Sequence, residues 1–455
     1  VGLVTARQGI EVGSGVGVAA SISVDGNAEF AGIVTATQFV GSGANLTGVA
    51  STENIRTNTN ATFLQNINVG VAITAGKLGI GFTDNNVKIG STALDALTTG
   101  TNNTAVGSAS LTATTTGARN VAVGYESLLN LTTGDDNTAL GTGALNACTT
   151  ASDNVAVGRN ALVSNTTGNN HAVVGATAGD ANTTGVNLTA IGFNAAGANT
   201  TGDNNTAVGK DALASSTTAT NLVAIGAFAL KQNTGSDNTA VGLSALELNT
   251  TGAQNVAVGS GALDANTTGD DNVAIGKGSL TDNTTGSNNV AIGLVALGDN
   301  TTASNNTAVG YYALRLNTTG ANNTAVGKSA LTANTTGTQN AAVGTNALAA
   351  NTTSNNNAAV GYDALAANTT GTYNTAVGSD ALETITTSSH STAVGSQALK
   401  LTTASGNTAV GSRSMEDTTT GSNNTAVGYD SLKENTTGTD NTAVGRAALD
   451  GNTTA

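Results

Sequence analysis

The chain has 455 residues, with Gly 59, Pro 0, Cys 1 and Trp 0, and only 10% of the residues are charged. The absence of proline excludes collagen and polyproline structures, and the low charge argues against intrinsic disorder. Lys and Arg number 15 against 29 Asp and Glu, and the formal net charge of −14 comes without any basic cluster. We therefore expect no nucleic-acid partner, and we expect no membrane insertion because no apolar run approaches about 20 residues.

Residues 1–85 come first and carry no strict repeat. Alternating apolar residues predict strands at 22–24 and 30–34, and the glycine-rich stretch 41–48 predicts a turn. We expect this segment to form a short β-rich base or shaft, separate from the rest of the chain.

Residues 86–455 consist of a repeat anchored on Ala-Val/Ile-Gly. The anchor glycine recurs 22 times from Gly90 to Gly445 at one constant interval, except that the intervals 226–242 and 395–411 are each one residue shorter. With the anchor as position 0, the consensus has Asn at −4, Ala at −2, Val or Ile at −1, Ala at +3, Leu at +4, Asn-Thr-Thr at +7 to +9 and Gly at +10. This strict period predicts an all-β fold, a parallel β-solenoid of about 22 coils of 17 residues.

The alternation of side chains along each strand defines two faces. We expect positions −3 and −1 to fill the coil interior together with the +4 leucine, so that the −2 alanine points the opposite way. A solvent-facing position would not be restricted to alanine, and we expect the alanine faces of three chains to meet in an intertwined or side-by-side homotrimer. A dimer or a single solenoid stays open. On this interpretation a charge at Ala257 or Ala325 blocks assembly, whereas the same charge at Ser260 does not.

Glycine at positions 0 and +10 predicts corners where a positive φ is needed. Asparagine at −4 and +7 predicts side-chain amide ladders between stacked coils. Lys88 stands where nearly all later repeats have alanine, which indicates that the first coil is an edge or cap.

No constellation of reactive residues is evident, and we expect the protein not to be an enzyme and to hold no cofactor or metal. The single cysteine, Cys148, is expected to be a small buried filler, and His171 and His390 are expected to be structural or solvated. The adjacent acids at 135–136 and 270–271 invite comparison with paired catalytic carboxylates, but they are more simply explained as turn formers.

Recognition can reside only at the variable positions, and position +1 carries several aromatic residues that could stack on the sugar rings of a host-surface glycan. Alternatively, each aromatic ring rests on the neighbouring coil. The candidate receptor-facing residues are Tyr125, Phe193, Tyr311, Tyr362 and Tyr429.

The repeat Asn-Thr-Ala-Val-Gly-x-x-Ala-Leu resembles the head repeat of YadA-like trimeric autotransporter adhesins. The resemblance extends over the repeat region, 86–455, and implies a trimeric, left-handed parallel β-roll with an adhesive role. The coil here is longer than in that family, and Ala-Leu replaces the family's Ser-x-Ala pattern. The family's coiled-coil stalk and membrane-anchoring barrel are missing from this sequence.

Residues 32–49, Gly-Ile-Val-Thr-Ala-Thr-Gln-Phe-Val-Gly-Ser-Gly-Ala-Asn-Leu-Thr-Gly-Val, are similar to stretches of cyanophage-like tail-fibre and virion-decoration proteins. That resemblance implies an extracellular virion fibre that binds other virion proteins at one end and supports attachment to a host surface. Because the chain starts at Val1 and stops partway through a repeat, we expect it to be a segment of a longer protein.

Other functions remain open alongside the fibre. They are a bacterial surface adhesin or extracellular filament subunit, an ice-binding solenoid that uses the Thr-Thr rows, and a depolymerase.

Overall fold

A computed structural model describes residues 10–12, 20–22, 28–30 and 85–454. The chain divides into two compact units, Val1–Gly76 and Lys77–Ala455.

In the first unit, β1 (Ile10–Val12), β2 (Ala20–Ile22) and β3 (Ala28–Phe30) form an antiparallel sheet in chain order. The strands predicted at 22–24 and 30–34 share only their first residues with β2 and β3. The rest of those two predictions, and the predicted turn at 41–48, lie outside the described residues.

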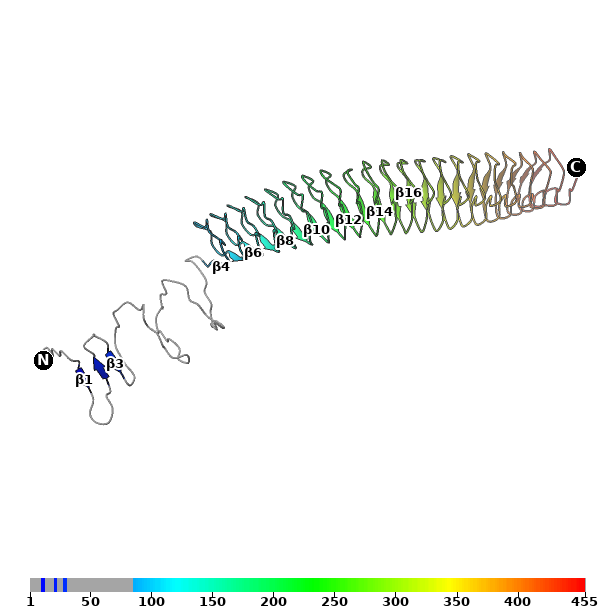
Figure 1. The fold of residues 1–455 in the computed structure, drawn as a ribbon. Coiled ribbons are helices and arrows are strands. Elements are labelled where there is room, and N and C mark those ends of the chain that lie inside the picture. Colours follow the sequence, from blue (N-terminus) through cyan, green and yellow to red (C-terminus); the bar gives the residue numbers. More distant parts are fainter. Residues whose placement is uncertain (1–9, 13–19, 23–27, 31–84, 455) are drawn as a thin grey trace. The chain divides into compact units, whose positions relative to one another are not determined.

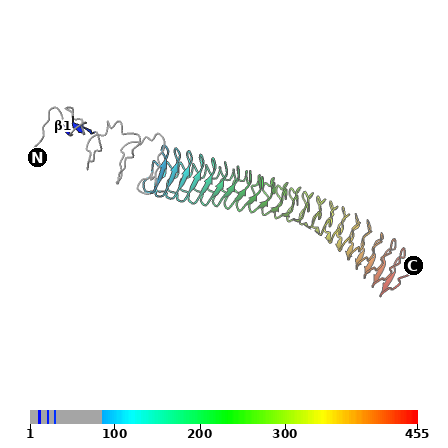
Figure 2. The same cartoon turned by 90° about the horizontal axis from the view of Figure 1, so that it is seen from below.

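The second unit is a parallel β-solenoid in which every repeat contributes one three-residue strand to a single sheet (Figure 1). Each strand pairs in register with the strands of adjacent coils. This register persists across the two shorter repeats, where Val223 pairs with Thr239 and Thr392 pairs with Thr408. Figure 2 shows that the row of coils curves gently. The predicted all-β parallel solenoid is confirmed. Its strands are β4 (Val87–Ile89), β5 (Thr104–Val106), β6 (Val121–Val123), β7 (Thr138–Leu140), β8 (Val155–Val157), β9 (Ala172–Val174), β10 (Thr189–Ile191), β11 (Thr206–Val208), β12 (Val223–Ile225), β13 (Thr239–Val241), β14 (Val256–Val258), β15 (Val273–Ile275), β16 (Val290–Ile292), β17 (Thr307–Val309), β18 (Thr324–Val326), β19 (Ala341–Val343), β20 (Ala358–Val360), β21 (Thr375–Val377), β22 (Thr392–Val394), β23 (Thr408–Val410), β24 (Thr425–Val427) and β25 (Thr442–Val444).

The two faces of the strand are the reverse of the sequence prediction. Ala257 in β14 is fully buried, whereas Val258 beside it is 37% exposed. The interior already holds the +3 and +4 side chains and two asparagines per coil, and this leaves room for alanine but little more on the strand wall. The alanine faces therefore cannot meet between chains, and a charge at Ala257 or Ala325 would disrupt the coil's own core rather than an interface.

Positions +3 and +4 both point inward, which a regular strand cannot achieve because its side chains alternate. Ala262 and Leu263 are both fully buried in one coil, and Leu263 adopts a φ of 54°. This left-handed conformation turns the chain so that two successive side chains reach the core. It is unfavourable for leucine by about 1–2 kcal/mol, which burial of the side chain offsets.

Two buried asparagine ladders run along the interior, as the sequence predicts. At position −4, the Oδ1 atom of Asn86 accepts the backbone N–H of Asn103 at 2.8 Å, and the Nδ2 atom of Asn103 donates to the carbonyl of Gly117 in its own coil. At position +7, the Nδ2 atom of Asn283 donates to the Oδ1 atom of Asn266 at 2.9 Å. Each amide therefore joins neighbouring coils and also closes its own coil.

The +7 ladder has interruptions, and unpaired polar atoms collect there. Of nine buried side-chain atoms without a hydrogen bond in the described part of the chain, four lie at position +7. The Oδ1 atom of Asn368 is unpaired because Ile385 in the next coil offers no donor, and the hydroxyl of Ser216 is unpaired between Asn199 and Asn233. The ladder is thus a source of stability that fails locally where asparagine is replaced.

Glycine is favoured at positions 0 and +10 for different physical reasons. Gly293 at position 0 has a φ of 134°, and a Cβ there would collide with the carbonyl of Gly310 in the next coil. Gly269 at position +10 does not have a positive φ, so the sequence prediction for that corner was wrong. Its glycine is favoured by the close approach of the next coil, and Ala303 occupies the equivalent place elsewhere.

Replacing Ser216 with asparagine should stabilise the solenoid by about 1–2 kcal/mol, because the new amide joins two separated ladder runs and removes an unpaired buried hydroxyl. Hydrogen exchange of the surrounding coils and the thermal unfolding midpoint measure the gain. Ser215→Asn, at the exposed neighbouring position, is the matched control, and an equal gain there would show that the ladder is not the cause.

Candidate functional site

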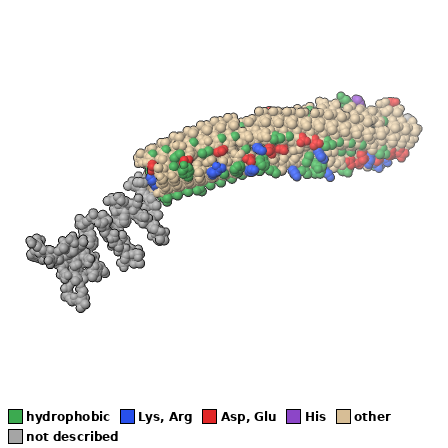
Figure 3. Space-filling model, viewed as in Figure 1, with side chains coloured by type: hydrophobic (Ala, Val, Ile, Leu, Met, Phe, Trp, Pro, Cys, Tyr) green, Lys and Arg blue, Asp and Glu red, His purple; other side chains and the backbone are tan. Residues whose placement is uncertain are grey.

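The five predicted aromatic residues lie on one line along the solenoid, at position +1 just after each strand. These residues are 42% to 54% exposed, so each rests partly on its neighbours. Two of the rings are already in contact with other side chains: Tyr312 lies 3.9 Å from Tyr311 between ring centroids, and the guanidinium groups of Arg413 and Arg446 lie 4.8 Å and 5.8 Å from the Tyr429 centroid. Hydrogen bonds to Glu126 and Asp363 raise the pKa values of Tyr125 and Tyr362, and both phenols remain neutral donors. Figure 3 shows most of the charged side chains and many apolar ones gathered along one side of the coils in that view, with fewer of either kind elsewhere.

The structure does not bring these aromatic residues together. Neighbouring members are separated by three to seven coils, or about 14–34 Å at the usual strand spacing. No single pocket can therefore include all five, and any recognition by this line of residues would be distributed along the rod.

Smaller aromatic clusters were not anticipated from the sequence. Phe228 lies beneath two ammonium groups, with Lys231 Nζ 5.0 Å and Lys210 Nζ 5.5 Å from its ring centroid. Tyr373 and His390 stack with ring centroids 5.2 Å apart at an exposed corner. Because Tyr373 and His390 hold the same position in successive repeats, aligning the repeats would have revealed that pair.

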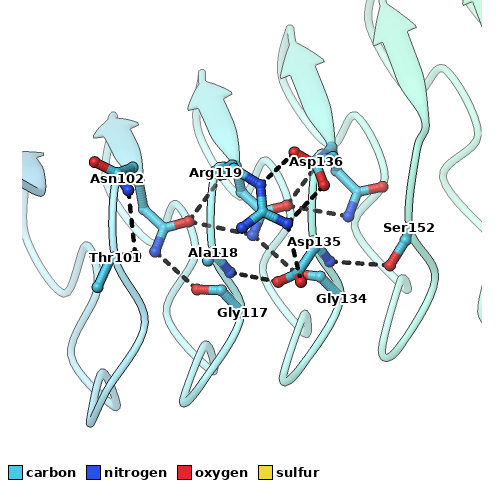
Figure 4. Close-up of polar contacts among 12 residues, drawn as sticks. Thr101, Asn102, Gly117, Ala118, Arg119, Gly134, Asp135, Asp136 and Ser152 are labelled. Carbon is cyan, nitrogen blue, oxygen red and sulfur yellow. Dashed lines mark hydrogen bonds and ion pairs between the residues drawn. The ribbon is translucent and has the colours of Figure 1, made fainter.

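The acidic pair at 135–136 belongs to a corner, as predicted, and Figure 4 shows how its carboxylates are used. Asp136 has a φ of 58°, and its Oδ1 atom accepts from Arg119 Nε at 2.7 Å. Asp135 accepts the backbone N–H of Ala118 at 2.7 Å and a second hydrogen bond from Arg119 at 3.2 Å. The hydrogen bond from Arg119 lowers the pKa of Asp136, and both carboxylates accept hydrogen bonds that connect this corner to the preceding coil.

His171 replaces the ladder asparagine at position −4 and reproduces its bonding. Its Nδ1 atom accepts the backbone N–H of Leu188 at 3.1 Å, and its Nε2 atom lies 3.3 Å from Asn182 Nδ2. Burial lowers the pKa of His171 to about 4, so the imidazole is neutral at physiological pH. The expectation of a structural histidine agrees with this geometry.

Cys148 occupies position +7 of its coil and is fully buried, which fits its expected role as a filler. Burial raises the pKa of its thiol to about 11, so little reactive thiolate forms near neutral pH.

Within the described ranges, His, Cys, Asp and Glu side chains form no group of three or more that could hold a metal ion. Those same ranges contain no helix with the length and apolar character needed to cross a membrane.

Searches against family models, curated proteins and solved structures found no match to this chain.

The solenoid should lose stability as the pH falls from 6.5 to about 4. Over this range the unfolded chain takes up a proton at His171, whereas the folded chain does not, and the loss reaches at most about 3 kcal/mol. His171→Asn should remove this dependence while keeping the ladder. Thermal unfolding midpoints at pH 5 and pH 8, measured for the wild type and for His171→Asn, test this pH dependence. His390→Asn, at an exposed corner, is the control. An unchanged pH dependence in His171→Asn would contradict the assignment.

Proposed function

We propose that the chain is a structural and adhesive fibre of a virion, a stiff rod that spans distance and supports attachment to a host surface. The observation that carries the proposal is the uninterrupted parallel stack from β4 to β25, which joins every coil to the next in one register. At about 4.8 Å per coil the stack is on the order of 100 Å long.

The bonding around each coil supports a stiff rod. In one coil, Val256 N–H donates to the carbonyl of Asn272 on the strand side, and Thr267 donates through both N–H and hydroxyl to the carbonyl of Thr284 on the far side. The buried amides connect the same coils inside. Because bonds run between coils on several sides, bending the rod must strain many of them together.

The outer surface suits distributed, weak contact better than catalysis. The +1 aromatics present rings at intervals along the rod, and several weak contacts on one stiff body can add to firm attachment. A host-surface glycan is the partner class that such rings fit, because sugar rings stack on aromatic faces. Other virion proteins would hold one end.

The runner-up is a bacterial surface adhesin or extracellular filament subunit, which the adhesin-like repeat favours. The ice-binding alternative is less well supported. Within the Thr-Thr pair, the hydroxyl of Thr267 at position +8 donates to a backbone carbonyl, which leaves only the exposed +9 row, with residues such as Thr268, free to contact ice.

Gold-labelled antibody against the solenoid should decorate projections on virus particles in negative-stain micrographs, with little label on the surface of uninfected host cells. Label confined to cell surfaces, with unlabelled particles, would contradict the virion proposal and favour the adhesin. Pre-immune antibody serves as the control for background binding.

A further inference from the structure

Position −1 is exposed in most repeats and half-buried in the others, and yet it is always aliphatic. Its occupant is Val, Ile or Leu in all 22 repeats, and typical exposed fractions are 40% for Ile225 and 37% for Ile292. Position −3, on the same outer face, holds Thr, Val or Ala, and neither position carries a charged residue in any repeat. We call these two rows together the aliphatic stripe.

Strand propensity alone does not account for the stripe. Threonine is β-branched and suits an exposed strand position, and it occurs often at −3 but never at −1. Position +1, which is also exposed, varies among Ser, Thr, Ala, Lys, Arg, Leu, Tyr and Phe. The restriction at −1 therefore indicates a surface that is covered in the working protein.

The stripe is large enough for a stable interface. A strip about 100 Å long and about 10 Å wide covers about 1,000 Å² per copy, which exceeds the roughly 800 Å² per partner of a standard interface. Exposed apolar patches of this size generally mark association sites.

We propose that the aliphatic stripe is the surface through which copies of this chain associate, parallel and in register, around an axis that runs along the rod. A second copy is the partner that matches the stripe in length, spacing and chemistry. This assignment deepens the proposed function by stating how the fibre's chains meet. The sequence alone predicts that the alanine faces form the contact between the chains of a homotrimer. The aliphatic stripe takes that place.

The two edges of the stripe carry opposite charges. Position +1 carries five cations and no acid, whereas position −5, just before the strand, carries five aspartates and a single cation, Arg119, already paired with Asp135 and Asp136. The cations are Arg159, Lys210, Lys277, Lys328 and Arg446, and the aspartates are Asp136, Asp153, Asp237, Asp271 and Asp440.

Rotation about an axis along the rod brings the +1 edge of one chain against the −5 edge of the next at the same level. Two copies running in opposite directions would instead place +1 edges together, cation against cation. The charge pattern therefore selects the parallel arrangement.

Three repeats carry both charges at one level, with an aspartate at −5 and a cation at +1 on opposite sides of the strand. The pairs are Asp153 with Arg159, Asp271 with Lys277, and Asp440 with Arg446. A three-residue strand and its flanking residues separate the two charges of a pair. Within residues 85–454 none of these six side chains forms an ion pair, so their charges are available for pairing between chains. Arg446 also lies over the ring of Tyr429, with its guanidinium carbon 5.8 Å from the centroid.

Light scattering of the purified 455-residue chain tests the stripe. The wild type should have two or three times the chain mass, and the triple variant Ile225→Asp, Val258→Asp and Ile292→Asp should be monomeric with an unchanged circular dichroism spectrum. The matched control is Thr251→Asp, Thr268→Asp and Thr285→Asp, with equal added charge at exposed +9 positions, and it should assemble like the wild type. A monomeric wild type, or a stripe variant that assembles normally, would overturn the proposal.

Charge reversal tests the parallel register. Arg159→Glu, Lys277→Glu and Arg446→Glu together should weaken association by about tenfold at low salt. Adding Asp153→Lys, Asp271→Lys and Asp440→Lys to the same chain should restore it. No weakening, or no restoration, would show that the two edges do not meet. Both tests measure association in purified protein, so their outcomes are independent of whether the rod belongs to a virion.

Discussion

The buried asparagine amides are the interaction on which the rest of the solenoid depends. A coil this short encloses too little volume for a conventional apolar core, and its interior holds mainly alanine, leucine and asparagine. The amides occupy this narrow space, satisfy backbone groups that would otherwise be unpaired, and fix the register of each coil on the next. Because the ladder requires the same residue at the same place in each coil, it also explains why the repeat is so strict.

The period, the parallel stacking, the ladders and the position-0 corner all follow from the residues, because each depends on spacing or on a single residue type. The choice of inner face does not follow, because alternation defines two faces without saying which is inside. The answer depends on the +4 leucine and the residue before it, both of which point inward through a left-handed turn such as that at Leu263. Alanine at −2 reflects the small volume that remains opposite them.

The candidate functional site could be predicted from the sequence less completely than the fold. The exposure of Tyr125 and its four counterparts follows from position +1, but their separation along the rod and the cluster around Phe228 depend on contacts between coils. Because the two strand faces are inverted relative to the sequence prediction, the outer surface also has a different proposed role. The aliphatic row that was expected to fill the coil lies outside, where it becomes the surface on which the proposed association of chains depends.

Thiol cross-linking tests the inverted faces most directly, because the native Cys148 is buried and contributes little background. Ala257→Cys and Val258→Cys place a thiol on either face of β14, and the inner position tolerates a larger side chain because Val173 occupies it in another coil. With a short bismaleimide, we expect Val258→Cys chains to become cross-linked to one another while Ala257→Cys stays unmodified. Cross-linking or labelling at Ala257→Cys, with none at Val258→Cys, would contradict this expectation.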